Sequence, residues 1–269
     1  MNQQLFDSIE MIVREAGRIV KNAHAGSEQI EKKEGLANFV TEYDVKVQEY
    51  LIGEFQKLIP DAAYFGEEAT DGNMQQASAE GYTFYIDPID GTTNFMFDYN
   101  FSCISVGVAY QKQMVAGFVY NPYVDEMFTA RRGEGSFVNG QRLQIQNLGI
   151  GEGIVAFGCA RYNEANMDLL FDAVKEIFWN SLSIRSGGSA ALDICRAAAN
   201  RNVGFLEFKL QPYDYAAASL IVEEADGVIA QVDGSPIDLE APCSILAGTP
   251  KACEEIRAII EKKAQEVSE

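Results

Sequence analysis

The spacing of apolar residues along the chain predicts six helices. In residues 3–23, Leu5, Ile9 and Ile12 recur every three to four positions, while Arg14 and Arg18 lie off that face. This is the pattern of an amphipathic helix. Residues 43–58 repeat the same spacing, and four later segments also have helical character. We therefore expect helices over residues 3–23, 43–58, 166–178, 190–199, 215–225 and 252–266.

Strand patterns fill much of the remaining chain. Residues 102–139 contain three apolar, β-branched runs separated by turns at Asn121-Pro122 and Asn139-Gly140. They predict an antiparallel meander that buries one face. Helices that alternate with runs of strands are typical of a layered α/β or α+β fold. We expect further strands over residues 84–86, 154–157, 203–208, 228–232 and 244–247.

The stretch from Phe84 to Phe95 carries the densest candidate chemistry. Its aromatic and β-branched start favours a buried strand, and Pro88 should end that strand because it has no backbone N–H. Asp87 and Asp90 flank this break, and Gly91 and two threonines follow as helix-start signals. Carboxylates beside an anion-binding helix start indicate a metal-assisted phosphate site. An ordinary strand-to-helix turn explains the same residues equally well.

Three other stretches have both a functional and a structural reading. The adjacent Glu67 and Glu68 follow a short apolar run, and a surface turn is their usual context. The glycine-rich segment 185–191 either admits a ligand or is capped by Ser189. Asp214 follows Pro212 at a helix start, where an N-cap role alone explains it.

The polar segment Gly26–Asn38 is a loop or a hairpin.

Composition restricts the class of protein. The 269 residues are 47% hydrophobic, which is enough for one large domain or two small ones that share an interface. No apolar run is long enough to span a membrane, and the N-terminus lacks the pattern of a signal peptide, so we expect a cytoplasmic protein. The net charge of −19 argues against nucleic acid and anionic membranes as partners. A phosphate substrate would therefore need bound cations.

Other catalytic classes find little support in the sequence. The five cysteines are scattered and form no C-x-x-C pair, which argues against a zinc site or a disulfide framework. A Ser-His-Asp or Cys-His mechanism would have to use His24, the one histidine. The chain has neither a G-x-S-x-G motif nor a P-loop.

Three motifs in order resemble those of the inositol monophosphatase family, within the fructose-1,6-bisphosphatase-like group of magnesium-dependent, lithium-sensitive phosphatases. They are Gly66-Glu67-Glu68, the nine residues from Asp87 to Phe95, and Pro212 to Ala217, in which Tyr213 takes the place of the usual Trp. The resemblance implies an αβαβα sandwich, a homodimer and a single domain over residues 1–269. Its approximate halves are 1–145, which holds the metal motif, and 146–269.

The resemblance also assigns roles to individual residues. Glu67, Asp87 and the Ile89 carbonyl are expected to bind a first Mg²⁺. A second Mg²⁺ is expected on Asp87, Asp90 and Asp214, and Glu67 would hold a third through water. Thr92 and Asp44 would orient the attacking water and accept its proton, so the expected catalytic set is Asp44, Glu67 and Thr92. The expected substrate contacts are Lys33, Asp90, Gly91, Thr92, Gly188, Ser189, Ala190 and Glu207.

The expected reaction is hydrolysis of an inositol monophosphate by a metal-activated water. Fructose 1,6-bisphosphate, a 3′-phosphonucleotide and NADP are alternative substrates, because the motifs specify the phosphate and the metals rather than the alcohol. A different class of function is also open: a metal-binding scaffold or regulatory partner that has lost catalysis. Lys209 lies beside the predicted ring pocket and would favour a second anionic group, and Asp226 stands where relatives commonly have glycine.

Overall fold

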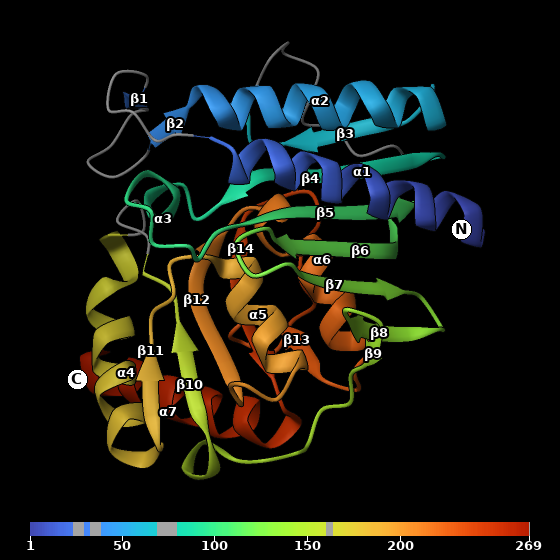
Figure 1. Cartoon of the computed structure of the whole chain (residues 1–269). Coiled ribbons are helices and arrows are strands. Elements are labelled where there is room, and N and C mark those ends of the chain that lie inside the picture. Colours follow the sequence, from blue (N-terminus) through green and yellow to red (C-terminus); the bar gives the residue numbers. More distant parts are fainter. Residues whose placement is uncertain (24–29, 33–38, 69–79, 160–163, 269) are drawn as a thin grey trace.

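In the computed structural model, helices and sheets alternate in five layers (Figure 1). The structure describes residues 1–23, 30–32, 39–68, 80–159 and 164–268. A pair of helices, a seven-stranded sheet, a second helix pair, a five-stranded sheet and a third helix pair follow one another. This is the αβαβα sandwich that the family resemblance implies.

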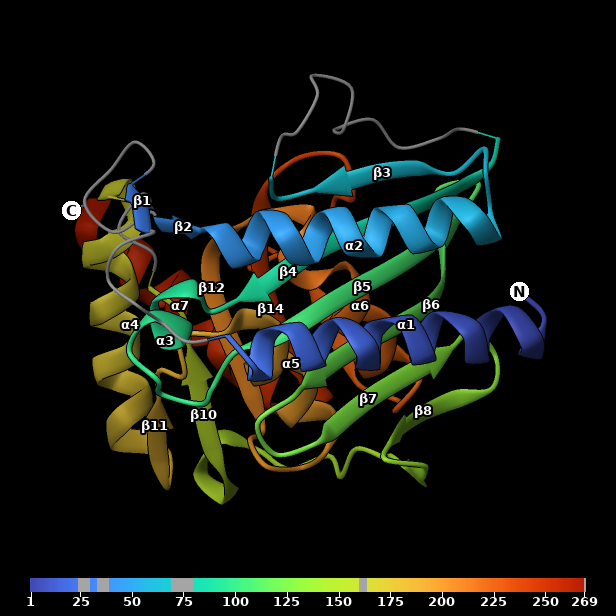
Figure 2. The same ribbon diagram turned by 45° about the horizontal axis from the view of Figure 1, so that its top comes forward.

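The first layer consists of α1 (Gln3–Lys21) and α2 (Glu42–Leu58), close to the predicted bounds. Asn2 caps α1, and its side chain accepts a hydrogen bond from the Leu5 backbone N–H at 2.9 Å. The apolar stripes of both helices pack on the first sheet, where Phe55 stacks on Phe84 with ring centroids 4.4 Å apart. Figure 2 shows the two helices lying side by side over the strands.

In the chain segment that connects α1 to α2, β1 (Ile30–Lys32) pairs antiparallel with β2 (Phe39–Thr41). This pairing agrees with the hairpin alternative for residues 26–38. Lys33 and His24 lie outside the described residues.

The first sheet has the strand order β3-β4-β5-β6-β7-β8-β9. Only its first pair, β3 with β4, is parallel, and every other pair is antiparallel. The predicted antiparallel meander over residues 102–139 is confirmed. The prediction that it buries only one face is wrong, because helices cover both faces of this sheet and its central strands are buried along nearly their whole length. The strands are β3 (Ala63–Gly66), β4 (Tyr82–Asp90), β5 (Cys103–Tyr110), β6 (Gln113–Asn121), β7 (Glu126–Arg131), β8 (Gly135–Val138) and β9 (Gln141–Arg142).

The second sheet has the order β11-β10-β12-β14-β13. Its strands are β10 (Ile154–Phe157), β11 (Ser183–Arg185), β12 (Gly204–Leu210), β13 (Val228–Ala230) and β14 (Cys243–Gly248). One face packs on α5 (Ala190–Ala198) and α6 (Pro212–Glu223), which also pack on the first sheet. The other face packs on α4 (Met167–Asn180) and α7 (Pro250–Ser268). Short 3₁₀ turns cover Ile150–Glu152 and Glu164–Asn166.

Two local predictions around Pro88 are wrong. β4 does not stop there but continues to Asp90, because a bulge between Asp87 and Asp90 places the proline where the ladder needs no N–H. The next helix, α3 (Thr92–Met96), is not capped by a threonine. Gly91 precedes it with φ 92°, in the left-handed region that favours glycine.

Four of the five cysteines are buried and all five are free thiols, in agreement with the absence of a disulfide framework. No helix in the described part of the chain is long and apolar enough to cross a membrane.

Candidate active site

The parallel pairing of β3 and β4 brings two of the acidic motifs together. Gly66 lies opposite Ile86 in the ladder, and the Glu67 N–H continues it by donating to the Ile86 carbonyl at 3.1 Å. Parallel neighbours end at the same edge of a sheet. Glu67 therefore lies beside Asp87, although they are far apart in sequence.

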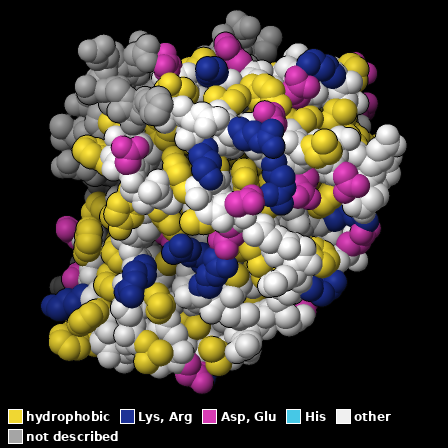
Figure 3. All heavy atoms as spheres, in the orientation of Figure 1, with side chains coloured by type: hydrophobic (Ala, Val, Ile, Leu, Met, Phe, Trp, Pro, Cys, Tyr) yellow, Lys and Arg dark blue, Asp and Glu magenta, His cyan; other side chains and the backbone are white. Residues whose placement is uncertain are grey.

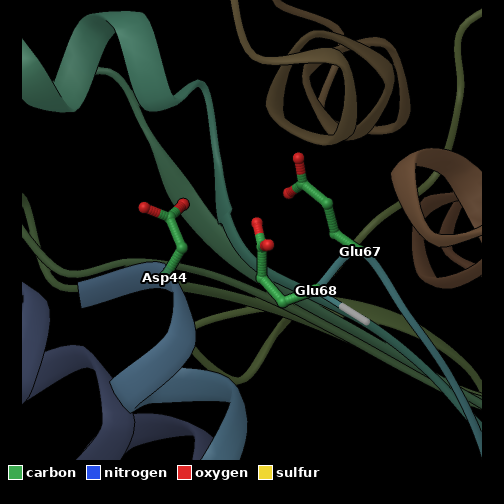
Figure 4. A group of neighbouring side chains, drawn as sticks. All are labelled: Asp44, Glu67 and Glu68. Atoms are coloured by element: carbon green, nitrogen blue, oxygen red, sulfur yellow. The ribbon is translucent and has the colours of Figure 1, made fainter. Parts of the chain in front are cut away.

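Asp44, Glu67 and Glu68 form a group of carboxylates that could hold a metal ion. One oxygen from each lies within 4.8 Å of the others. Figure 4 shows Asp44 reaching in from the start of α2, and both glutamates extending from the end of β3. Only Glu67 of this group belongs to the expected metal ligands. Glu68 is 7% exposed, so the surface-turn reading of these glutamates is wrong.

Gln48 fixes this end of β3 to α2. Its side-chain oxygen accepts the Glu68 N–H at 3.0 Å, and its nitrogen donates to the Glu68 carbonyl at 2.5 Å. Gly66 leaves room for this contact, because a Cβ there would lie 2.4 Å from the Gln48 oxygen. Gln48 was not among the residues predicted to belong to the site. A polar residue at a buried helix position was the only available signal.

The site contains the carboxylates of Asp44, Glu67, Asp87, Asp90 and Asp214, which repel one another in the absence of a cation. Burial raises the pKa of Asp87 well above its ordinary value, and the nearby charges of Glu67, Asp90, Asp214 and Asp44 raise it further. The pKa of Asp214 is raised in the same way, by burial first and then by Asp90. Carboxylate oxygens are the ligands that hard divalent cations prefer. The cluster therefore fits a divalent cation.

Asp90 is held by the segment that opens α5. Its Oδ2 accepts hydrogen bonds from the Ser189 hydroxyl at 2.6 Å and the Ala191 N–H at 2.8 Å, and its Oδ1 accepts one from the Ala190 N–H at 3.2 Å. Burial raises the pKa of Asp90, and these hydrogen bonds oppose the rise. The Ser189 hydroxyl thus serves the site. Ser189 does stand at the N-cap position of α5, but its side chain makes no capping hydrogen bond there.

Asn94 joins the start of α3 to the glycine-rich turn. Its side-chain nitrogen donates to the Gly187 carbonyl at 2.8 Å and to the Phe101 carbonyl at 2.7 Å. Gly91 packs against the same turn, where a Cβ would lie 2.9 Å from the Gly188 carbonyl oxygen. The turn therefore lies against both the metal motif and α5.

Thr92 connects the helix start with Asp44. Its hydroxyl lies 3.4 Å from Asp44 Oδ1, a long hydrogen bond, and 3.2 Å from the Ile89 carbonyl. Because Asp44 also lies beside Glu67, the structure brings together all three residues expected to be catalytic. Asp44 is fully buried.

Asp214 has one oxygen engaged in the helix start. Its Oδ2 accepts the Gln211 N–H at 2.7 Å, so the structural reading of Asp214 holds for that oxygen. Glu207 is 6% exposed, and its charge contributes to the raised pKa of Asp214. Gly158 packs directly against Glu207. A Cβ at position 158 would lie 1.9 Å from the Glu207 Oε2. Glu207 therefore belongs to the same acidic site.

The comparisons with known proteins agree with this geometry. The model of the inositol monophosphatase family matches residues 1–265. Inositol monophosphatase 1 of Mus musculus is 32% identical over 262 residues, 96% of this chain and 95% of that protein. Inositol monophosphatase 2 of Solanum lycopersicum is 34% identical over 235 residues, 85% of this chain and 87% of that protein.

Solved structures with the same fold cover nearly the whole chain. The extragenic suppressor protein suhB from Bartonella henselae has a TM-score of 0.87 at 28% identity and covers 97% of this chain and 99% of that one. SaIMPase-II with inositol monophosphate bound has a TM-score of 0.82 at 26% identity and covers 98% and 96%.

The fold and its acidic site define an enzyme, a phosphomonoesterase. The chain belongs to the inositol monophosphatase family.

Proposed function

We propose that the protein hydrolyses inositol monophosphate to inositol and phosphate, with Mg²⁺ as its cofactor. The observation that carries this proposal is the convergence of Asp44, Glu67, Asp87, Asp90 and Asp214, which burial and mutual repulsion leave unstable without cations. Mg²⁺ prefers oxygen ligands and keeps several waters. A chain of net charge −19 needs such cations to bind a phosphate dianion.

We assign Glu67, Asp87 and the Ile89 carbonyl to a first Mg²⁺, and Asp87, Asp90 and Asp214 to a second. Glu67 would hold a third ion through water. The hydrogen bonds that fix Asp90 support this assignment, because held ligands favour a defined geometry. Glu68 is an additional candidate, since its carboxylate shares the space between Asp44 and Glu67.

Mg²⁺ would polarise the phosphoryl oxygens and lower the pKa of a bound water. Thr92 and Asp44 orient that water, since the Thr92 hydroxyl lies within reach of Asp44 Oδ1. Asp44 accepts the water proton, through Thr92 or directly. Backbone N–H groups of Gly91 and Thr92 bind the phosphate oxygens, and the left-handed φ of Gly91 sets the backbone at this turn.

The ring of the substrate would lie between Glu207 and the segment Gly188–Ala190. Glu207 is an acceptor for hydroxyl groups, and the two parts of this pocket meet at the acidic site. SaIMPase-II has been solved with inositol monophosphate and also with 2′AMP. This pair of ligands on a similar protein makes a 2′-phosphonucleotide the second candidate substrate here.

The test is phosphate release from a panel of phosphomonoesters with and without Mg²⁺. The panel holds inositol 1-phosphate, 2′-AMP, a 3′-phosphonucleotide, fructose 1,6-bisphosphate and NADP. We expect magnesium-dependent release, fastest from inositol 1-phosphate, and a loss of at least ~10³-fold in Asp90→Asn. Faster turnover of another ester would move the assignment to that substrate. Magnesium-independent turnover, or an unchanged Asp90→Asn, would refute the proposed site.

We also propose a cytoplasmic, lithium-sensitive homodimer built from one domain over residues 1–269. Exposed apolar side chains support self-association, since Trp179 is 75% and Leu182 70% exposed at the end of α4 and the start of β11. Sedimentation of wild type and Trp179→Glu tests the dimer. A wild-type monomer at micromolar concentration would contradict it.

A further inference from the structure

Gln48 is a polar side chain at a fully buried position of α2. It follows Asp44 by four residues, and residues with this spacing lie on the same face of a helix. Both residues are 0% exposed, and both reach the two glutamates that follow β3. One turn of α2 therefore presents a carboxylate and an amide to Glu67 and Glu68.

The chain bends at these two glutamates. Consecutive residues of a regular strand point to opposite faces. Carboxylate oxygens of Glu67 and Glu68 nevertheless lie within 4.8 Å of each other and of an Asp44 oxygen. Figure 4 shows both glutamate side chains extending into the space beside Asp44. The bend is therefore what lets two consecutive carboxylates reach one cation.

Hydrogen bonds fix the bend from two sides. On one side, the Glu67 N–H donates to the Ile86 carbonyl of β4 at 3.1 Å. On the other side, the Gln48 oxygen accepts the Glu68 N–H at 3.0 Å, and the Gln48 nitrogen donates to the Glu68 carbonyl at 2.5 Å. A neutral amide makes both bonds, whereas an ionised carboxylate has no donor and an apolar side chain has neither group. Gln48 thus acts on Glu68 as a neighbouring strand would.

The metal ion has to supply the positive charge at this site. The four side chains whose charges act most on Asp87 are all carboxylates. Lys and Arg side chains appear at the surface on the face shown in Figure 3, among apolar and acidic ones. The affinity for a divalent cation therefore depends on how closely the carboxylate oxygens converge, and the bend sets the position of two of them.

We propose that Gln48 is a positioning residue that sets the Mg²⁺ affinity of the site by holding the bend at Glu67 and Glu68, an inference that rests on the proposed function. Residues that orient metal ligands commonly change metal affinity about 10- to 100-fold when they are replaced. Gly66 takes part in the same arrangement, because a Cβ there would lie 2.4 Å from the Gln48 oxygen and would displace the amide.

Calorimetric titration of Mg²⁺ into the full-length protein tests this role without turnover. Gln48→Ala should weaken Mg²⁺ binding at least ~10-fold. Thr249→Ala is the matched control, because the buried Thr249 hydroxyl also donates to one backbone carbonyl, of Leu148, and accepts one backbone N–H, of Ala252. Thr249 precedes α7, in the helix layer opposite α2 (Figure 1). Thr249→Ala should lower the melting temperature as Gln48→Ala does, but should keep the Kd for Mg²⁺ within about twofold of wild type.

A double-mutant cycle separates positioning from a general loss of packing. Gly66→Ala alone should also weaken Mg²⁺ binding, because the new Cβ displaces the Gln48 amide. In the Gln48→Ala protein that amide is already gone. Adding Gly66→Ala to it should therefore change the Kd for Mg²⁺ by less than about twofold.

The outcomes separate the role of Gln48 from the proposed function. Unchanged Mg²⁺ binding in Gln48→Ala, an equal loss in Thr249→Ala, or losses that multiply in the double variant would each overturn the role of Gln48 and leave the proposed function intact. A wild type that binds no Mg²⁺ would overturn both. If Gln48→Ala does not fold, Gly66→Ala decides alone, and wild-type affinity in that variant would overturn the role.

Discussion

Asp87→Asn should make the metal-free protein more stable while abolishing its response to Mg²⁺. Asp87 is 2% exposed, and its charge is opposed by burial and by four neighbouring carboxylates. Asparagine keeps the oxygen that accepts the Ile89 N–H at 3.1 Å, so the local turn survives. The substitution therefore removes a costly charge and leaves the backbone contact in place.

The size of the effect follows from the linkage between ionisation and folding. Every tenfold by which ionisation is disfavoured in the native state corresponds to about 1.4 kcal/mol. We expect Asp87→Asn to gain about 2 kcal/mol at pH 8 in EDTA. The folded-state pKa is raised, so the cost of Asp87 is absent below the unfolded pKa, grows as pH rises from the unfolded to the folded pKa, and is complete above the folded pKa. The gain should vanish near pH 4.

Urea denaturation at pH 4 and pH 8, with EDTA or with Mg²⁺, measures both effects. Saturating Mg²⁺ at a hundred times its Kd should stabilise the wild type by about 2.7 kcal/mol and the variant by much less. Glu152→Gln, an exposed carboxylate paired with Lys251, is the control and should show no such gain. The reasoning would be refuted by an Asp87→Asn protein less stable than wild type at pH 8, or by a gain that persists at pH 4.

Three further changes test other parts of the molecule. Burial raises the pKa of Asp193 to about 7, so wild-type stability should fall between about pH 4 and pH 7, by up to about 4 kcal/mol; Asp193→Asn keeps an acceptor for Gly187 and should flatten that decline in urea titrations. Gly158→Ala places a Cβ 1.9 Å from Glu207 Oε2 and should raise KM for inositol 1-phosphate about tenfold at similar kcat, as Glu207→Gln should; an unchanged KM would exclude Glu207 from the pocket. Asp226 has φ 62°, so Asp226→Gly should raise stability by up to about 1 kcal/mol, and a loss would mean that its hydrogen bond from Gln144 dominates.

Elements with strong local periodicity were predictable from the sequence. The amphipathic stripe of α1 and the turn residues Asn139 and Gly140, both at positive φ, specify local structure without distant partners. The path of β4 past Pro88 was not predictable in this way. A proline stops a strand only where the ladder needs its N–H, and the register with β5 decides that.

The sequence by itself determined the layered fold, the family and the acidic motifs, because periodicity and short motifs are written in neighbouring residues. The tertiary structure decided how these motifs meet. Ser189 and Ala191 hold Asp90 across 99 and 101 residues, and Gln48 fixes Glu68 across 20. Such contacts depend on how the layers pack, since a hydroxyl, an amide and a carboxylate carry no local sign of their partners.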